Sequence, residues 1–208
     1  MSTTVVDLKR ELHGLYSAKR EPALVDVPDL PFLMIDGRGD PNTAPAYADA
    51  VQALYSVAYT IRFALKRRPD AVDAPVMPLE GLWWMPDMAT FSTEDKSQWN
   101  WTMMIVVPEQ VTAQVVEGAR SAAATKKPLA SLSRVRRERY AEGRCAQVLH
   151  VGPYSAEGPT IATLHAFISG HGYVLSGKHH EIYLGDPRRS APEKLRTIVR
   201  QPVAPAEG

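Results

Sequence analysis

Residues 145–184, CAQVLHVGPYSAEGPTIATLHAFISGHGYVLSGKHHEIYL, contain the pattern that decides the fold. They begin with the apolar, strand-like run 145–151, which is followed by a turn rich in glycine and proline. Apolar residues then recur at three- and four-residue steps, which predicts an amphipathic helix that ends near Gly170. Further strand-like runs follow at 180–184 and 195–203. The order is therefore strand, turn with proline, helix, strand, strand.

The first half of the chain follows the same order. The run 32–35 is strand-like and stops at DGRGD, residues 36–40, which we interpret as a turn. Residues 43–68 carry apolar side chains at helical steps and predict a long helix. Strands are expected at 79–85 and 99–107. The sequence therefore predicts an α+β fold of duplicated strand–helix–strand–strand modules with antiparallel sheets.

A chain of 208 residues is long for one small domain and short for two, so we expect a single domain spanning residues 1–208. The polar stretch 86–98, PDMATFSTEDKSQ, is expected to form the turn between the two strands of the first module. The parts of the domain are expected to be an N-terminal helix within residues 1–19 (at about 6–17), a first module at about 20–107, a connecting helix and edge segment at 108–144, and a second module at 145–203.

Charge and cysteine usage restrict the expected partners. The formal net charge is +1, so no strong field recruits nucleic acid or an anionic membrane. The single cysteine, Cys145, excludes an intrachain disulfide and favours a reducing compartment. No apolar run reaches the roughly 20 residues of a membrane span, and the N-terminal segment lacks a signal-peptide core. We expect a cytoplasmic monomer or homodimer, with neither nucleic acid nor membrane as a partner.

The tryptophans of the chain gather in two strands that we expect to be adjacent. They are Trp83, Trp84, Trp99 and Trp101. Strand side chains alternate between faces, so Trp99 and Trp101 share a face, whereas Trp83 and Trp84 point to opposite sides. One interpretation is that all four fill the core. The other is an aromatic wall for a flat ligand, since the face of a tryptophan also attracts cations.

Two glutamates lie within predicted strands. Glu80 has the strand parity of Trp84, and Glu181 has the parity of Tyr183. The neighbours of Glu181 are mainly apolar or aromatic, so a pocket suits it better than a solvated edge. Burial in an apolar pocket raises the pKa of a carboxyl group. Such a group can hold a cationic ligand or act as a general base toward water.

Other candidate sites are weaker. Neighbouring residues in a strand point to opposite faces, so His179, His180 and Glu181 cannot easily converge on one ion, and we expect no metal site. No base partner is identifiable for Cys145 as a nucleophile. The basic run from Arg134 to Arg139 is interrupted by acidic residues, which favours a solvated face over a nucleic-acid patch.

Several segments resemble the GyrI-like small-molecule-binding family. They are most similar to its stand-alone branch, which includes cyclopropanoid cyclopropyl hydrolases. The resemblance extends from about residue 20 to residue 203. The segments that carry it are LVDVPDLPFLMIDGRGDPN at 24–42, LEGLWW at 79–84, HVGPYSAEGPT at 150–160 and HHEIYLGDPRR at 179–189.

The resemblance implies two modules related by a pseudo-twofold axis around a central ligand pocket, which has a glutamate near its centre and aromatic walls. Some family members sense drugs within transcription regulators, and the member that names the family protects DNA gyrase. The hydrolase branch opens the strained ring of DNA-alkylating antibiotics by adding water. By motif, Glu181 corresponds to the central glutamate, with Tyr183 beside it. Glu80 and Trp84 correspond to a second acidic and aromatic pair.

Three functions are therefore expected. The first is binding of flat, hydrophobic or cationic xenobiotics, with cofactor-independent hydrolysis of electrophilic cyclopropanoids, as in detoxification and antibiotic resistance. No cofactor is expected, because ring strain would drive this hydrolysis. The second is non-catalytic drug sequestration or sensing in the same pocket. The third is a protein-interaction inhibitor of DNA gyrase. The predicted catalytic residues are Glu181, Tyr183 and Glu80, and the predicted ligand-binding residues are Trp84, Trp99, Trp101 and Trp83.

Overall fold

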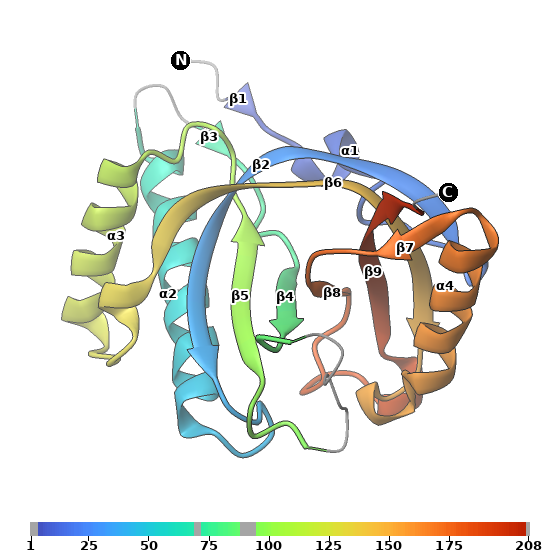
Figure 1. The fold of residues 1–208 in the computed structure, drawn as a ribbon. Helices are drawn as coiled ribbons and strands as arrows, with labels where there is room; N and C mark the ends of the chain where they lie inside the picture. The colour runs from blue at the N-terminus through green and yellow to red at the C-terminus, as the bar shows by residue number, and fades with distance from the viewer. Residues whose placement is uncertain (1–3, 69–71, 88–94, 207–208) are drawn as a thin grey trace. The chain divides into compact units, whose positions relative to one another are not determined.

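The computed structural model describes residues 4–68, 72–87 and 95–206 (Figure 1). The helices are α1 (Leu8–Glu11), α2 (Pro45–Lys66), α3 (Ala113–Lys126) and α4 (Gly158–Gly170). The strands are β1 (Thr4–Val5), β2 (Ala23–Arg38), β3 (Val72–Asp73), β4 (Leu79–Trp84), β5 (Asn100–Val106), β6 (Arg136–Val151), β7 (Tyr173–Leu175), β8 (His179–Tyr183) and β9 (Arg196–Pro205). Single 3₁₀ turns lie at Leu132–Arg134, Tyr154–Ala156 and Pro192–Lys194.

The predicted doubling of the chain is confirmed in the order of its elements. The series β2, α2, β4, β5 has the same order as the series β6, α4, β8, β9. The pairs β2–β5, β6–β9, β7–β9 and β8–β9 are antiparallel, whereas the short β1 and β3 pair in parallel. The fold is therefore α+β, with antiparallel strands, as the sequence predicts.

The chain divides into two compact units. Unit 1 contains residues 1–11, 30–77 and 83–140, and unit 2 contains residues 12–29, 78–82 and 141–208. The strands β2, β4 and β6 each contribute residues to both units. Each unit is therefore assembled from segments that are distant in sequence.

In unit 1, β2 and β5 pair in one continuous register. Phe32 lies opposite Val106 at one end, and Arg38 lies opposite Asn100 at the other. β2 is buried at every residue from 32 to 35, and β5 is buried at every residue from 101 to 106. Because consecutive residues point to opposite faces, both faces of this part of the sheet are covered.

The helix α2 follows from its sequence. Pro45 occupies its first turn, where a backbone N–H has no partner within the helix in any case. Lys66 lies in the last turn, where a positive charge is favourable to the helix dipole. The helix predicted for 43–68 is confirmed almost over its full length. Its buried residues recur at helical steps and are Ala50, Ala53, Leu54, Val57, Ala58, Ile61 and Leu65.

In unit 2, β9 pairs with three strands. Along β8, His180 lies opposite Arg200, and along β6 the register extends from Cys145 opposite Pro202 to Val151 opposite Arg196. β9 also pairs with β7. Figure 1 shows α4 beside these strands, and its apolar side forms a core with them. The buried members of this core are Ala146, Val148, Leu164, Ile168, Val199 and Val203.

The N-terminal helix is shorter than predicted. A helix was expected at residues 6–17, but α1 ends at Glu11 and hydrogen-bonded turns follow. Gly14 lies in the predicted helix, and a glycine costs about 1 kcal/mol in a helix interior relative to alanine. Leu8, Leu12 and Leu15, the apolar residues expected on one side of the helix, do not compensate for that cost over so short a segment.

The strand predicted at 32–35 is also only part of β2. Asp36, Gly37 and Arg38, interpreted as the start of a turn, belong to the strand. The chain turns at Gly39, whose φ of 105° suits a glycine. β7 has no counterpart among the predicted strands. Of the polar link predicted at 86–98, residues 88–94 lie outside the described residues.

Candidate functional site

Glu181 is the centre of a hydrogen-bonded group on β8 in unit 2. Its Oε2 accepts a hydrogen bond of 2.7 Å from the Tyr183 hydroxyl. Its Oε1 accepts one of 3.2 Å from His179, whose Nε2 carries a proton. The strand brings the three side chains together because residues two apart point to the same face. The Glu181 side chain keeps 12% exposure.

Glu157, the residue before α4, joins this group. Val199, which lies opposite Glu181 on β9, belongs to the core beneath α4, so Glu181 points to the α4 side of the sheet. The Glu157 carboxyl group is hydrogen-bonded to Glu181 there, and Glu157 is only 5% exposed. Glu157, His179, Glu181 and Tyr183 are called the Glu181 cluster below.

Aromatic and imidazole groups surround this cluster. The ring of Tyr154 contacts that of Tyr183 edge-on, with centroids 5.5 Å apart. His165 of α4 lies close to His179, and burial together with this neighbour lowers the pKa of His165. Its Nε2 is buried and has no hydrogen-bond partner among the described residues. The cluster therefore has a neutral imidazole and an aromatic ring as neighbours.

The turn between β6 and α4 holds Glu157 in place. His150 Nε2 is 3.2 Å from the carbonyl oxygen of Pro153, and its Nδ1 is 2.9 Å from the Thr160 hydroxyl. A carbonyl can only accept, so Nε2 carries the proton and Nδ1 accepts from Thr160. Gly152, with φ of 141°, allows the chain to leave β6 sharply. His150 thus connects the end of the strand to both sides of the turn.

The electrostatics of Glu181 correct one prediction. Burial alone raises the pKa of a carboxyl group. Hydrogen bonds from His179, Tyr183 and Glu157, together with the charge of His179, outweigh burial and hold the pKa of Glu181 below its usual range. The predicted rise is therefore wrong, because donors surround the carboxylate, and Glu181 is ionised at neutral pH.

On the opposite face of β8, His180 lies between two glutamates. Its Nε2 is 3.0 Å from Glu80 Oε2, and its Nδ1 is 2.9 Å from Glu142 Oε1. All three side chains are only 1% exposed. Since carboxylate oxygens face both ring nitrogens, both nitrogens carry protons and His180 is an imidazolium.

Arg200 supplies the second positive charge. It lies opposite His180 across the β8–β9 pair, and its guanidinium is 3.4 Å from Glu142 Oε2. The guanidinium also donates to Gln147 Oε1 at 3.0 Å and to the carbonyl oxygen of Leu15. The charges in this part of unit 2 are therefore paired and hydrogen-bonded, as buried charges must be.

Tyr16 completes this second group, because its hydroxyl donates to Glu80 Oε1. Burial, followed by the charge of Glu80, raises the pKa of Tyr16 well above its usual value. Burial would lower the pKa of His180, but Glu142 and Glu80 raise it to about 9. Burial would raise the pKa of Glu142, but His180 and Arg200 lower it. Tyr16, Glu80, Glu142, Gln147, His180 and Arg200 are called the buried ion cluster below.

Glu80, predicted as the second catalytic carboxylate, belongs to this buried ion cluster. Its two oxygens accept from Tyr16 and His180, and its side chain is 1% exposed. Glu80 and Glu181 therefore lie in two different groups, on opposite faces of β8. That Glu80 takes part in catalysis stays a prediction.

Three of the four tryptophans form an aromatic cluster in unit 1. The ring centroid of Tyr47, on α2, is 6.0 Å from that of Trp83 and 5.2 Å from that of Trp101. Trp83 in turn lies 5.4 Å from Trp99. All three indoles are buried, as a core interpretation predicts. Trp84, the next residue after Trp83, is half-buried and points to the other face of β4.

Trp101 explains why Gly37 lies inside a strand. The two residues are opposite each other in the β2–β5 register. A Cβ atom at position 37 would lie 2.0 Å from the Trp101 ring, so only glycine leaves room for the indole. The buried Nε1 of Trp101 has no hydrogen-bond partner within the described part of the chain.

The predicted catalytic residues and the predicted ligand-binding residues thus lie in different units. Glu181, Tyr183 and Glu80 belong to unit 2, and the four tryptophans belong to unit 1. That they line one pocket stays a prediction. Sequence reasoning does not identify His179 or Glu157 as partners of Glu181. The shared strand parity of His179 was an available signal, whereas Glu157 comes from a turn that has no periodicity.

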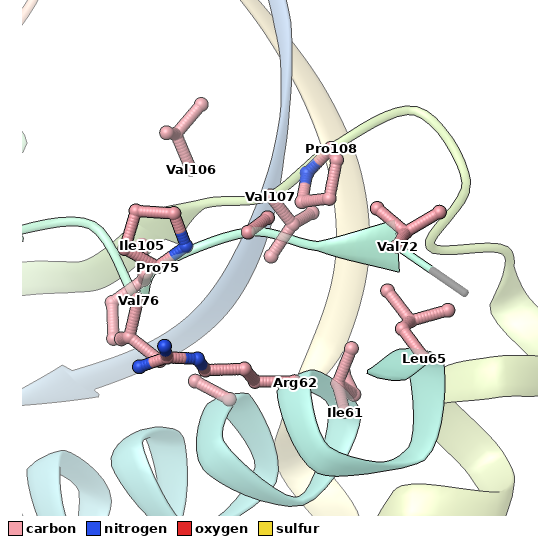
Figure 2. Close-up of a pocket in the computed structure, with 12 residues that line it drawn as sticks. Ile61, Arg62, Leu65, Val72, Pro75, Val76, Ile105, Val106, Val107 and Pro108 are labelled. Atoms are coloured by element: carbon pink, nitrogen blue, oxygen red, sulfur yellow. The ribbon is translucent and has the colours of Figure 1, made fainter. Parts of the chain in front are cut away.

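A small apolar cavity lies in unit 1 (Figure 2). Its walls come from α2, β3, β5 and the segment that follows β3, and they include Ile61, Leu65, Val72 and Ile105. The cavity has a volume of about 20 Å³, which is enough for about one water molecule. It is therefore too small for a flat drug.

The remaining candidates from the sequence have structural partners. Arg136 pairs with Asp36 at 2.9 Å, and Arg139 pairs with Glu109 at 2.8 Å. Cys145 is buried, and burial raises the pKa of its thiol. In residues 4–68, 72–87 and 95–206, no three histidine, cysteine or acidic side chains are grouped to hold a metal ion. None of the helices described is long and apolar enough to span a membrane.

Comparisons with known proteins place the chain in a family. The model of the GyrI-like small molecule binding domain matches residues 20–204. An uncharacterized conserved protein from Listeria innocua is 43% identical, with a TM-score of 0.89, over 96% of this chain and all of its own. A hydrolase from Listeria innocua is 41% identical, with a TM-score of 0.86, over 97% of this chain and all of its own.

More distant structures agree in fold. The C-terminal domain of EcmrR is 11% identical, with a TM-score of 0.55, over 89% of this chain and 98% of its own. A search of curated proteins gave no match. Because the family model covers most of the sequence, the chain belongs to the GyrI-like family of small-molecule-binding domains.

Proposed function

We propose that this protein binds flat, hydrophobic small molecules, including cationic ones, and hydrolyses electrophilic cyclopropanoids by adding water. The observation that carries the proposal is the Glu181 cluster, in which hydrogen-bond donors fix the carboxylate of a partly exposed side chain. Membership of a small-molecule-binding family supports the binding half. Structures of two proteins called hydrolases, 40% and 41% identical to this chain, support the catalytic half.

The proposed step breaks one ring C–C bond and one O–H bond of water. Glu181 accepts a hydrogen bond from the water, whose oxygen attacks the methylene carbon of the cyclopropane. The electron pair of the broken C–C bond moves to the conjugated carbonyl oxygen, which takes a proton from solvent. The water proton passes to Glu181 and then to solvent. Ring strain drives the reaction, so no cofactor takes part.

The other predicted site residues have proposed roles of two kinds. Tyr183 already donates to Glu181, so it orients the carboxylate and becomes available to the ligand oxygen when a ligand displaces that bond. Glu80 acts indirectly, since its contact with His180 supports β8 from the other face. Trp84, as the half-buried indole, stacks on the ligand. Trp83, Trp99 and Trp101 are buried, and their proposed role in ligand binding is to hold the strand that carries Trp84 in place.

The test is to incubate the purified protein with a cyclopropanoid alkylator and to follow the ring-opened product by mass spectrometry. Glu181→Gln removes the carboxylate and keeps its size. We expect it to lower the rate by a factor of about 10² or more, because general-base catalysis contributes on the order of 10²–10⁴. Tyr183→Phe, which loses only an orienting hydroxyl, is expected to have a smaller effect.

Glu193→Gln is the matched control, since it removes one carboxylate from an exposed position of unit 2. Its rate is expected to equal that of the wild type. Absence of product with the wild type, or equal rates for wild type and Glu181→Gln, would rule out the proposed hydrolysis.

Non-catalytic sequestration is the second candidate, and the tryptophan distribution favours it. Trp83, Trp99 and Trp101 are buried, whereas Trp84 remains half-buried, so one indole is available to a flat ligand. A ligand that quenches tryptophan emission and is recovered chemically unchanged after long incubation would support sequestration. Recovery of ring-opened product would contradict it.

A further inference from the structure

The proposed step makes no use of one buried acid, Glu157. Its backbone is fixed, because its carbonyl oxygen accepts from Ile161 N at 2.9 Å and its own N–H donates to Tyr154. Its carboxyl group is not used to cap α4. The side chain instead turns to Glu181, where it is hydrogen-bonded within a buried environment.

A hydrogen bond between two carboxyl groups requires a proton. Two carboxylates that share a site repel each other, and burial strengthens that repulsion, so one of them binds a proton at a pH where an isolated glutamate would be ionised. The two groups then titrate as a pair. Glu157 and Glu181 meet this condition, since both are largely buried and in contact.

The neighbours decide which carboxyl group is the anion. Tyr183 and His179 both donate to Glu181, one to each oxygen. The N-terminus of α4 acts in the other direction, because its dipole favours an anion at Glu157. Two directed hydrogen bonds to a charged group exceed the weaker effect of a helix dipole. The proton therefore resides on Glu157, which donates to Glu181.

We infer that Glu157 and Glu181 hold one proton between them, and that Glu157 is the positioning residue that keeps the carboxylate of Glu181 ionised and aimed. The inference deepens the proposed function and rests on it for the consequences in catalysis. The carboxylate has about four acceptor positions in total. Donors from Glu157, His179 and Tyr183 occupy three of them, which leaves one for the reacting water.

This arrangement limits the pH range in which Glu181 can act as a base, at both the acidic and the alkaline end. As the pH falls, the pair binds a second proton. This proton resides on Glu181, which can then no longer accept a proton from water. As the pH rises, Glu157 loses its proton, and two anions then face each other. The other groups that face the pair are His179 and Tyr183 on β8, Tyr154 in the preceding turn and His165 on α4. Because these neighbours are also ionisable groups, variants at position 157 are needed to assign the titration.

The test follows the carboxyl carbons of labelled glutamates by NMR as a function of pH, in the full chain without ligand. Glu157→Gln and Glu181→Gln assign the two signals, and Glu193→Gln, an exposed residue of unit 2, is the control. In the wild type, we expect one carboxyl group to titrate below the ordinary glutamate range and the other above it. Glu181→Gln should return Glu157 toward the ordinary range, whereas Glu193→Gln should change neither signal.

Glu157→Gln distinguishes a proton donor from a second base. A glutamine amide still donates to Glu181, so we expect Glu181 to titrate below the ordinary glutamate range as before. The titration step above that range, which belongs to Glu157, should disappear. Independent titration of both groups at ordinary values would overturn the inference. So would a Glu181 signal that is the same in the wild type and in Glu157→Ala, in a variant whose circular dichroism shows it to be folded.

Turnover of a cyclopropanoid gives a separate readout. Glu157→Gln is expected to abolish the decline of the rate at alkaline pH, whereas Glu193→Gln is expected to keep the wild-type pH profile. A rate for Glu157→Gln as low as that of Glu181→Gln would contradict a positioning role. If the wild type shows no turnover but Glu157 and Glu181 titrate as a coupled pair, the proposed hydrolysis is wrong and the inference of a shared proton is still supported.

Discussion

One histidine, His180, lies at the centre of several buried charged groups. It is enclosed by Glu80 and Glu142, and Arg200 supplies a further positive charge. Buried ion pairs contribute little net stability when compared with apolar residues, but removal of one partner leaves an uncompensated buried charge. The stability of unit 2 therefore depends on the protonation of this one side chain.

We expect stability to decline at alkaline pH. The pKa of His180 is about 9 in the folded protein, against roughly 6.5 in an unfolded chain. A raised pKa contributes stability that is fully present below pH 6.5 and is lost as the pH rises through about 9. The contribution is on the order of 3 kcal/mol. Urea denaturation at a series of pH values measures it.

Two variants check the origin of this pH dependence. His180→Gln is expected to flatten the alkaline decline and to lower stability at neutral pH by about 3–5 kcal/mol, because Glu80 and Glu142 lose their cation. His13→Gln, at an exposed position, should leave the curve unchanged. An alkaline decline that persists in His180→Gln would assign it to another group.

At the scale of elements, the pairing of β2 with β5 depends on one small residue. The Trp101 ring occupies the space above Gly37, and the two positions are in direct register. A side chain at position 37 would therefore compete with the indole for the same volume. The register of these strands, in turn, sets which residues of β5 face Tyr47 on α2.

Gly37→Ala is expected to destabilise the protein by about 1–3 kcal/mol, as is usual when atoms are added to a packed core. Gly118→Ala, in α3, is the matched control, since nothing lies within 4 Å of its added Cβ. That control should be stabilising by about 0.5–1 kcal/mol, because alanine favours a helix interior. Chemical denaturation of the two variants compares them directly, and equal stabilities would contradict the packing argument.

At the scale of the molecule, the two compact units share strands along the chain. Unit 2 needs residues 12–29 and 78–82 as well as 141–208. The first segment supplies Tyr16 and the Leu15 carbonyl to the buried ion cluster, and the second supplies Glu80. A fragment that ends or begins near residue 140 therefore leaves buried charges without partners.

We expect residues 141–208 alone to remain unfolded, because His180 and Arg200 would lose Glu80 and Leu15 as partners. Co-expression with residues 1–140 should restore a folded complex. Circular dichroism and NMR dispersion of the fragment, with and without its complement, measure this. A cooperative unfolding transition of the isolated fragment would contradict the expectation.

The features that could be predicted from the sequence are those with a regular period along the chain. Period-two alternation on β8 placed Glu181 and Tyr183 together, and helical periodicity located α2 and α4. The sequence did not reveal Glu157, because its contact with Glu181 joins a turn to a strand. The direction of the pKa shift of Glu181 was also out of reach, since it depends on donors that only the folded chain assembles.

The distribution of indoles has a spectroscopic consequence. All four tryptophans belong to unit 1, and unit 2 contains none. The indoles of Trp83 and Trp99, with ring centroids 5.4 Å apart, are close enough for excitonic coupling. Indole emission and the near-ultraviolet circular dichroism of this pair therefore report on unit 1 alone. The imidazole signals of His150, His165, His179 and His180 report on unit 2, so the wild-type chain contains a separate natural label for each of its units.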